Sequence, residues 1–173
     1  MVNATAYSNI ERACNSCKTR TNDCYDAGHI PLKKLNDQCR LGGMKEGCYL
    51  PTEKTVVGEL YLGSDAAFDE WRDVLCQLVL GRELLEVQDK VESYAFDALV
   101  KLDCGETTYP SAILGLKVVE SLLADFNTFA ARVEKRVASN RGGELPDEEW
   151  LATYKAWQRL LQIATDGGVV VFD

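Results

Sequence analysis

Cysteine is the residue type in this chain with the clearest chemical potential. Five of the seven cysteines lie within the first 50 residues: Cys14, Cys17, Cys24, Cys39 and Cys48. Cys14 and Cys17 form a CxxC pair, in which two thiolates can reach one tetrahedral metal ion across a tight turn. The five cysteines are therefore candidate metal ligands, with zinc as the expected cofactor. Disulfides, or plain thiols in a loop, are the alternatives.

Other side chains give little support for catalysis. His29 is the single histidine, so a Ser-His-Asp triad or a Cys-His dyad would have to use it. The motifs GxSxG, GxxxxGK[ST] and GxGxxG do not occur. The acidic pairs Glu83/Glu86 and Glu148/Glu149 fall on helix positions that we expect to face water. The sequence therefore predicts that the protein is not an enzyme.

The cysteine spacing resembles that of the binuclear zinc-cluster domain of fungal transcription factors. The resemblance lies in ERACNSCKTRTNDC, followed by NDQC and GCYLPTEK, and covers about residues 11–54. The family pattern is C-x2-C-x6-C, a loop of 5–12 residues, then C-x2-C-x6–8-C. All spacings fit, except that Asn36 replaces the fourth cysteine. The resemblance implies a zinc-binding transcription regulator in the nucleus, with a cytoplasmic location as the alternative.

Asn36 changes the expected metal content. In that family the first and fourth cysteines bridge two zinc ions, and an amide in place of a bridging thiolate removes a soft, negative donor from both ions. The expected remnant is one zinc ion held by Cys14, Cys17 and Cys24 with either Cys39 or Cys48. His29 and Asp37 are alternative ligands, although neither lies at a ligand position of the family.

DNA contacts in this family come from a basic run between the second and third cysteines. Here that run keeps Lys18 and Arg20 but also contains Asp23, which repels phosphate. We expect Lys18 and Arg20 to be the DNA-binding residues, and two cations support only weak affinity for a single copy.

Charge is unevenly distributed along the chain. Residues 1–55 contain eight basic and six acidic residues, whereas residues 56–173 contain eleven and twenty-one, for a net charge of −8. An acidic body does not attract phosphate backbones, so any contact with DNA must come from the N-terminal third. No apolar run approaches the roughly 18 residues of a membrane span. The first 25 residues lack the apolar core of a secretory signal, so we expect no membrane association and reduced cysteines.

The chain divides into a Cys-rich, zinc-cluster-like module at residues 1–54 and an acidic helical domain at residues 55–173. Apolar stripes at helical spacing predict helices from Ser64 as N-cap, over 84–102, from Thr108–Pro110 to Val137, and from Pro146 to Ala164. The predicted fold is mostly α, an antiparallel bundle of three or four helices. The β-branched runs at 55–62 and 169–172 predict two strands that pair as a short ribbon.

Two functional hypotheses follow. The first is a transcription regulator whose N-terminal module binds zinc and double-stranded DNA, while the helical domain serves regulation or self-association. The second is a protein without DNA binding, in which the cysteines staple an N-terminal loop and the helical domain binds a protein partner or has a structural role. Binding to duplex DNA at physiological salt separates them.

The first hypothesis predicts a specific effect of the two cations. Lys18→Ala and Arg20→Ala should each weaken binding of the metal-loaded protein to duplex DNA and flatten its salt dependence, because each removes one phosphate contact. Fluorescence anisotropy over a salt series measures both quantities. Unaltered binding, or no binding tighter than about 10⁻⁴ M in the unmodified protein, would favour the second hypothesis.

Overall fold

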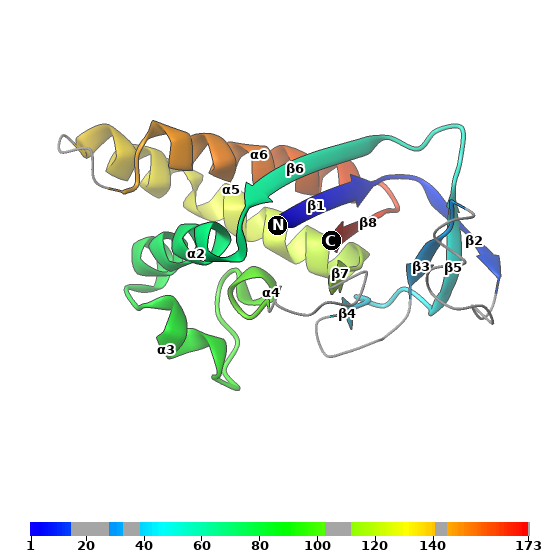
Figure 1. The fold of residues 1–173 in the computed structure, drawn as a ribbon, viewed down its shortest axis with the longest axis horizontal. Coiled ribbons are helices and arrows are strands. Elements are labelled where there is room, and N and C mark those ends of the chain that lie inside the picture. Colours follow the sequence, from blue (N-terminus) through cyan, green and yellow to red (C-terminus); the bar gives the residue numbers. More distant parts are fainter. Residues whose placement is uncertain (15–27, 33–38, 103–111, 141–144, 173) are drawn as a thin grey trace.

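The computed structural model describes residues 1–14, 28–32, 39–102, 112–140 and 145–172 (Figure 1). Strands come first and helices dominate the second half. In chain order the elements are β1 (Val2–Tyr7), β2 (Ile10–Cys14), β3 (Ile30–Leu32), β4 (Cys39–Arg40), β5 (Gly47–Pro51), β6 (Val57–Gly63), α2 (Asp65–Leu80), α3 (Leu84–Gln88), α4 (Asp97–Val100), β7 (Ala112–Leu114), α5 (Leu116–Ser139), α6 (Glu148–Ala164) and β8 (Val169–Phe172).

Two sheets organise the molecule. The larger has five strands in the order β4-β7-β8-β1-β6, antiparallel except for the parallel pair β4–β7. The smaller has three antiparallel strands in the order β2-β5-β3 and lies at one end of the larger sheet (Figure 1). The first 54 residues thus supply strands to both sheets, and β1 lies between two strands from the second part of the chain.

Both faces of the larger sheet are buried around β7 and β8, and alternate side chains of these strands point to opposite faces. Val170 and Phe172 join the core formed with the helices, whereas Val169, Val171 and Ile113 pack against apolar side chains of the smaller sheet. Burial on both faces explains why β8 reads as the unbroken apolar run VVVF. Gly168 immediately precedes β8, and a Cβ atom there would overlap the Tyr7 carbonyl oxygen. The start of β8 therefore requires a residue without a side chain.

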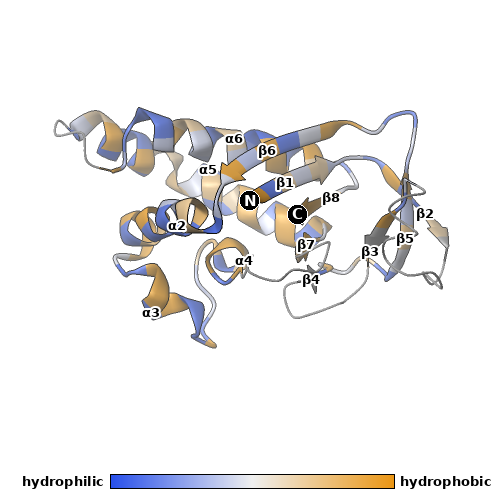
Figure 2. Ribbon diagram, in the orientation of Figure 1, coloured by the Kyte–Doolittle hydropathy of each residue, from blue (hydrophilic) through white to orange (hydrophobic). Residues whose placement is uncertain are grey.

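The helices form a layer on one face of the larger sheet. Figure 2 shows alternating polar and apolar segments along α5 and α6, as expected for helices with one buried face. Trp71 of α2 and Trp150 of α6 each donate an indole N–H hydrogen bond to the other's backbone carbonyl, at 3.3 and 3.2 Å, with ring centroids 5.3 Å apart. This reciprocal pair fixes α2 against α6.

The prediction of a mostly α fold is wrong, because the molecule is an α/β structure with two sheets. The strands before residue 55 were missed for a physical reason. The core-facing residues of β1 include Ala4 and Ala6, which are small and have low β propensity, so their alternation is a weak signal. The smaller sheet consists of strands of only three to five residues.

The predicted ribbon is also wrong, although both of its segments are strands. β1 lies between β6 and β8 and pairs with each of them, so the two segments do not pair directly. In place of one helix over 84–102, the chain forms the short helices α3 and α4. The long helix begins at Leu116 rather than Pro110, and Ile113 lies in β7. Ser64 caps α2, as predicted: its side chain accepts a hydrogen bond from the Ala67 amide at 3.2 Å.

Arg72 is a buried charge that connects α2 to the end of α4. Only 2% of its surface is exposed, and its guanidinium donates hydrogen bonds to the carbonyls of Leu99 and Leu102 and to the Asp69 carboxylate. The guanidinium carbon also lies 4.7 Å from the centre of the Phe68 ring. These carbonyls lie at the C-terminal end of a one-turn helix, where backbone acceptors are not fully satisfied within the helix; the Leu99 carbonyl also accepts the Leu102 amide at 3.3 Å.

Arg72→Met should therefore lower the free energy of unfolding by about 3 kcal/mol, because it fills much of the same volume but removes the guanidinium donors from the carbonyls of Leu99 and Leu102. Urea denaturation followed by circular dichroism measures the loss. Arg159→Met, at an exposed position of α6, is the matched control and should change stability by less than about 0.5 kcal/mol. Equal effects of the two substitutions would contradict a structural role for Arg72.

Candidate functional site

A cleft of about 370 Å³ opens between β6, α2 and α6, and we call it the aromatic cleft. Phe68, Trp71 and Trp150 supply its most deeply buried side chains. Tyr61 and Leu145 also line it and are its accessible apolar groups, with 63% and 42% of their surfaces exposed. Most large apolar side chains of the described residues are buried, and Tyr61 and Leu145 are among the minority that are exposed.

Carboxylates surround the apolar part of the aromatic cleft. Glu70 comes from α2, whereas Asp147 and Glu149 come from the start of α6. Asp147 is the N-cap of α6 and accepts a hydrogen bond from the Trp150 amide at 2.8 Å. Glu70 and Glu149 are exposed and form no ion pair with any described residue. Among the described residues the lining contains no Lys, Arg or His, so the ionised groups described there are all acidic.

The dipeptide Glu-Trp occurs in both helices that line the aromatic cleft, α2 and α6. Glu70-Trp71 and Glu149-Trp150 are Glu-Trp pairs, and the reciprocal hydrogen bonds of the two tryptophans bring them together across the α2–α6 contact. The sequence indicates each tryptophan only as part of a helical core stripe. The repeated dipeptide is the signal that could have pointed to a shared site.

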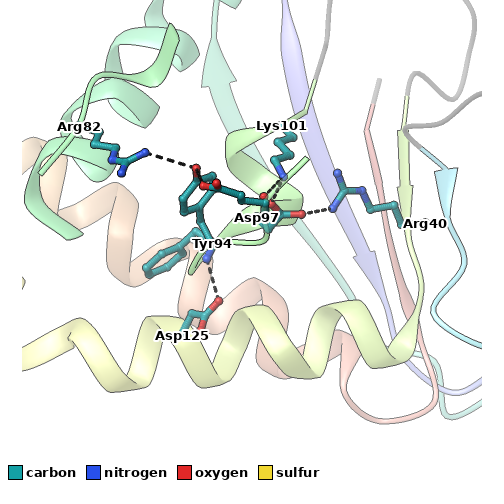
Figure 3. A network of polar contacts seen from close by, with 8 residues as sticks. Arg40, Arg82, Tyr94, Asp97, Lys101 and Asp125 are labelled. Carbon is teal, nitrogen blue, oxygen red and sulfur yellow. Dashed lines mark hydrogen bonds and ion pairs between the residues drawn. The ribbon is translucent and has the colours of Figure 1, made fainter. Parts of the chain in front are cut away.

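A second polar region lies where α4 meets α5 and β4 (Figure 3). Asp97 forms ion pairs with Arg40, at 3.0 Å, and with Lys101. Burial favours the neutral form of Asp97, but hydrogen bonds from Lys101 and Arg40 outweigh it and lower the pKa of the carboxyl. The Asp125 carboxylate accepts the Phe96 amide at 2.8 Å.

Phe96 has a left-handed backbone, with φ of 61°, which is uncommon for an aromatic residue. Its buried ring packs edge-on against Phe126, with centroids 4.8 Å apart, and its amide is held by Asp125. The neighbouring cavity of about 300 Å³ is lined by Arg40, Asp97 and Asp125, which already have partners within the protein. We interpret this region as a structural clamp on residues 94–101.

The predicted metal ligands are only partly within the described residues. The backbones of Cys14 in β2 and Cys48 in β5 lie opposite each other in the smaller sheet, whereas Cys39 pairs with Ile113 in the larger sheet. Cys17, Cys24, Asn36 and the predicted DNA-binding residues Lys18 and Arg20 lie outside the described residues.

Cys48 is buried and takes part in a disulfide, which is one of the alternatives that the sequence left open. A sulfur in a disulfide is not available as a thiolate ligand. Across the described residues, no three His, Cys, Asp or Glu side chains gather as a metal-binding group. Zinc binding by the N-terminal cysteines outside this disulfide stays a prediction.

Cys76 is the cysteine outside the N-terminal segment whose side chain the structure describes, and it is a free thiol buried in α2. Burial raises the pKa of this thiol to about 12, and the nearby Asp73 carboxylate adds to the effect. A thiol that remains protonated is a poor nucleophile. Cys76 is therefore a core residue.

No protein family matches the chain, and no curated protein or solved structure is significantly similar to it. Among the described residues, no helix combines the length and apolar character that a transmembrane span requires.

Asp97→Asn tests the structural clamp. Because the folded protein lowers the pKa of Asp97, its carboxylate stabilises the fold above the unfolded-state pKa near 4, and this stabilisation is lost as the pH falls through the lower folded-state pKa. The variant should lose about 1–2 kcal/mol of unfolding free energy at pH 7, and its difference from the unmodified protein should shrink steadily below pH 4. Urea titrations over this pH range measure both. Asp89→Asn, at an exposed residue after α3, is the control, and an equal pH-7 loss in this control would contradict the assignment.

Proposed function

We propose that the protein is a binding protein rather than an enzyme, and that the aromatic cleft holds a basic, partly apolar peptide segment of a protein partner. One observation carries the proposal: an accessible aromatic and aliphatic surface is bordered by three carboxylates, and no basic side chain lines it in the part of the chain that the structure describes. A Lys or Arg side chain matches such a surface, because its methylene stem is apolar and its end is cationic.

Two kinds of contact support this choice of ligand. Tyr61 is the most exposed ring in the cleft, and a cation over a tyrosine ring at an exposed site gains about 0.5–1 kcal/mol. Glu70 and Glu149 are free to pair with a cation of the ligand, since neither is engaged in an ion pair with a described residue. A neutral apolar ligand would leave these carboxylates without a partner.

Helix stabilisation explains some of the acidic residues but not all of them. Asp147 caps α6, and Glu149 lies in its first turn, where a negative charge interacts favourably with the helix dipole. Glu70 lies in the second turn of α2, beyond the first-turn acid Asp65. Glu70 therefore neither caps a helix nor lies in a first turn. Its substitution tests ligand binding without removing a charge that stabilises a helix N-terminus.

The zinc-cluster hypothesis remains a separate prediction. Cysteine spacing supports it, and the disulfide at Cys48 supports the alternative in which cysteines staple the N-terminal segment. The acidic aromatic cleft does not suit DNA, because its carboxylates repel phosphate. A protein partner is thus the better match to this site.

The test uses two synthetic peptides that differ in one charge. The first is an acetylated octapeptide with one central arginine flanked by leucines, and the second carries neutral citrulline in place of arginine. We expect the arginine peptide to bind more tightly in NMR titrations of the intact protein. Glu70→Gln should weaken it about three- to fivefold, equivalent to about 0.7–1 kcal/mol, without altering the citrulline peptide. Tyr61→Ala should weaken both.

Glu120→Gln, which removes an exposed carboxylate from α5 outside the cleft, is the matched control and should leave both affinities unchanged. Equal affinity for the two peptides would overturn the assignment of a cationic ligand. A dissociation constant of about 5 mM corresponds to a binding free energy of about −3 kcal/mol. If neither peptide binds at a concentration of about 5 mM, the assignment of the cleft as a peptide site is overturned.

A further inference from the structure

A groove with the opposite charge lies between α2 and α5, and we call it the basic groove. It encloses about 410 Å³ and is lined by Arg132, Lys135, Arg136 and Ser139 of α5, facing Gln77 and Leu78 of α2. The α5 residues are spaced by three, four and seven positions from Arg132, so they lie on one face of the helix. No carboxylate of the described residues lines this groove.

The three cations of the basic groove have no side-chain partner among the described residues. None of them forms an ion pair or a side-chain hydrogen bond with a described residue. Glu134 lies between them in sequence, but its carboxylate pairs with Lys155 of α6 at 2.9 Å. By contrast, Arg40, Arg72 and Lys101 all have carboxylate partners. In the described part of an acidic chain, these three positive charges thus lie together without a carboxylate partner.

Neutral groups complete the lining. Gln77 donates one amide hydrogen to Asp73 at 2.7 Å, which orients its side chain and leaves a second amide hydrogen. The Asp73 carboxylate also accepts the Leu84 amide at 2.6 Å, so this nearby negative charge is held on the α2 side by two donors. Leu78 provides an apolar wall. Ser139 donates its hydroxyl hydrogen to the Arg136 carbonyl at 2.9 Å.

We propose that the basic groove binds a small molecule through a phosphate monoester group. Guanidinium groups contact phosphate oxygens in pairs, and a lysine adds a compact positive charge, so two arginines and one lysine suit a dianion. A volume of about 410 Å³ is in the range of small-molecule pockets, and Leu78 can contact the organic part of the ligand.

The short length of helix over which the three cations are spread favours a small ligand over a nucleic acid. Arg132 to Ser139 covers two helical turns, or roughly 10 Å, which accommodates only a few phosphates. The rest of the chain carries excess negative charge, since the net charge is −8 despite these three cations. A polymer extending past the groove would therefore meet repulsion.

The test compares inorganic phosphate, adenosine 5′-monophosphate and adenosine in NMR titrations of the intact protein. We expect both phosphates to shift amide signals of α5 around residues 132–139, with the nucleotide binding more tightly, whereas adenosine should bind at least about tenfold more weakly than the nucleotide. The double variant Arg132→Gln/Arg136→Gln should weaken both phosphates by at least about tenfold. Raising the salt concentration should weaken both as well.

Arg159→Gln removes an exposed arginine of α6 and is the matched control; phosphate binding should persist in it. Equal binding of adenosine and its monophosphate, or unchanged phosphate binding in the double variant, would overturn the proposal. A 20-base-pair DNA duplex that binds over a hundredfold more tightly than the nucleotide, and loses that affinity in the double variant, would reassign the groove to nucleic acid. The absence of any shift at 10 mM phosphate would show that the groove is not a phosphate site.

Discussion

The burial of β8 on both faces is the constraint on which the rest of the structure depends. Its four residues, Val169–Phe172, are all buried, and a strand of this composition cannot present either face to water at low cost. The helical layer covers one face through Val170 and Phe172, and the smaller sheet covers the other through Val169 and Val171. The N-terminal segment is therefore part of the core of the molecule, with β1 as the direct neighbour of β8.

Polar contacts within the helical layer decide which surfaces remain open. The reciprocal bonds of Trp71 and Trp150 hold α2 against α6, and Arg72 ties α2 to the end of α4. Because these contacts fix α2 at a defined position, its N-terminal half borders the aromatic cleft and its C-terminal half borders the basic groove. One helix thus contributes to two sites of opposite charge, with Glu70 at the first and Gln77 at the second.

This arrangement favours a binding protein that recognises ligands of two kinds. The charges that stabilise the fold, such as Asp97 with Arg40 and Lys101, are paired inside the protein. Glu70 and Glu149 at the aromatic cleft, and the three cations of the basic groove, form no ion pair with a described residue, which makes them available to a partner. The disulfide at Cys48 in the smaller sheet is consistent with a stapling role for cysteines in the N-terminal segment.

The sequence by itself determined the elements with strong local signals. Ser64 as the cap of α2, the helix that follows Pro146, and the strand at 169–172 could all be predicted, because each depends on side chains near one another in the chain. Only the tertiary structure decided that β1 separates β6 from β8, and that Glu70-Trp71 meets Glu149-Trp150 at one cleft. These pairings join residues at least 50 positions apart, and β1, with two alanines on its buried face, shows too weak an alternation of apolar and polar residues to reveal them. Local sequence patterns indicate which side chains of an element face inward. Which strands and helices pack against one another depends on how the whole chain buries its apolar surface.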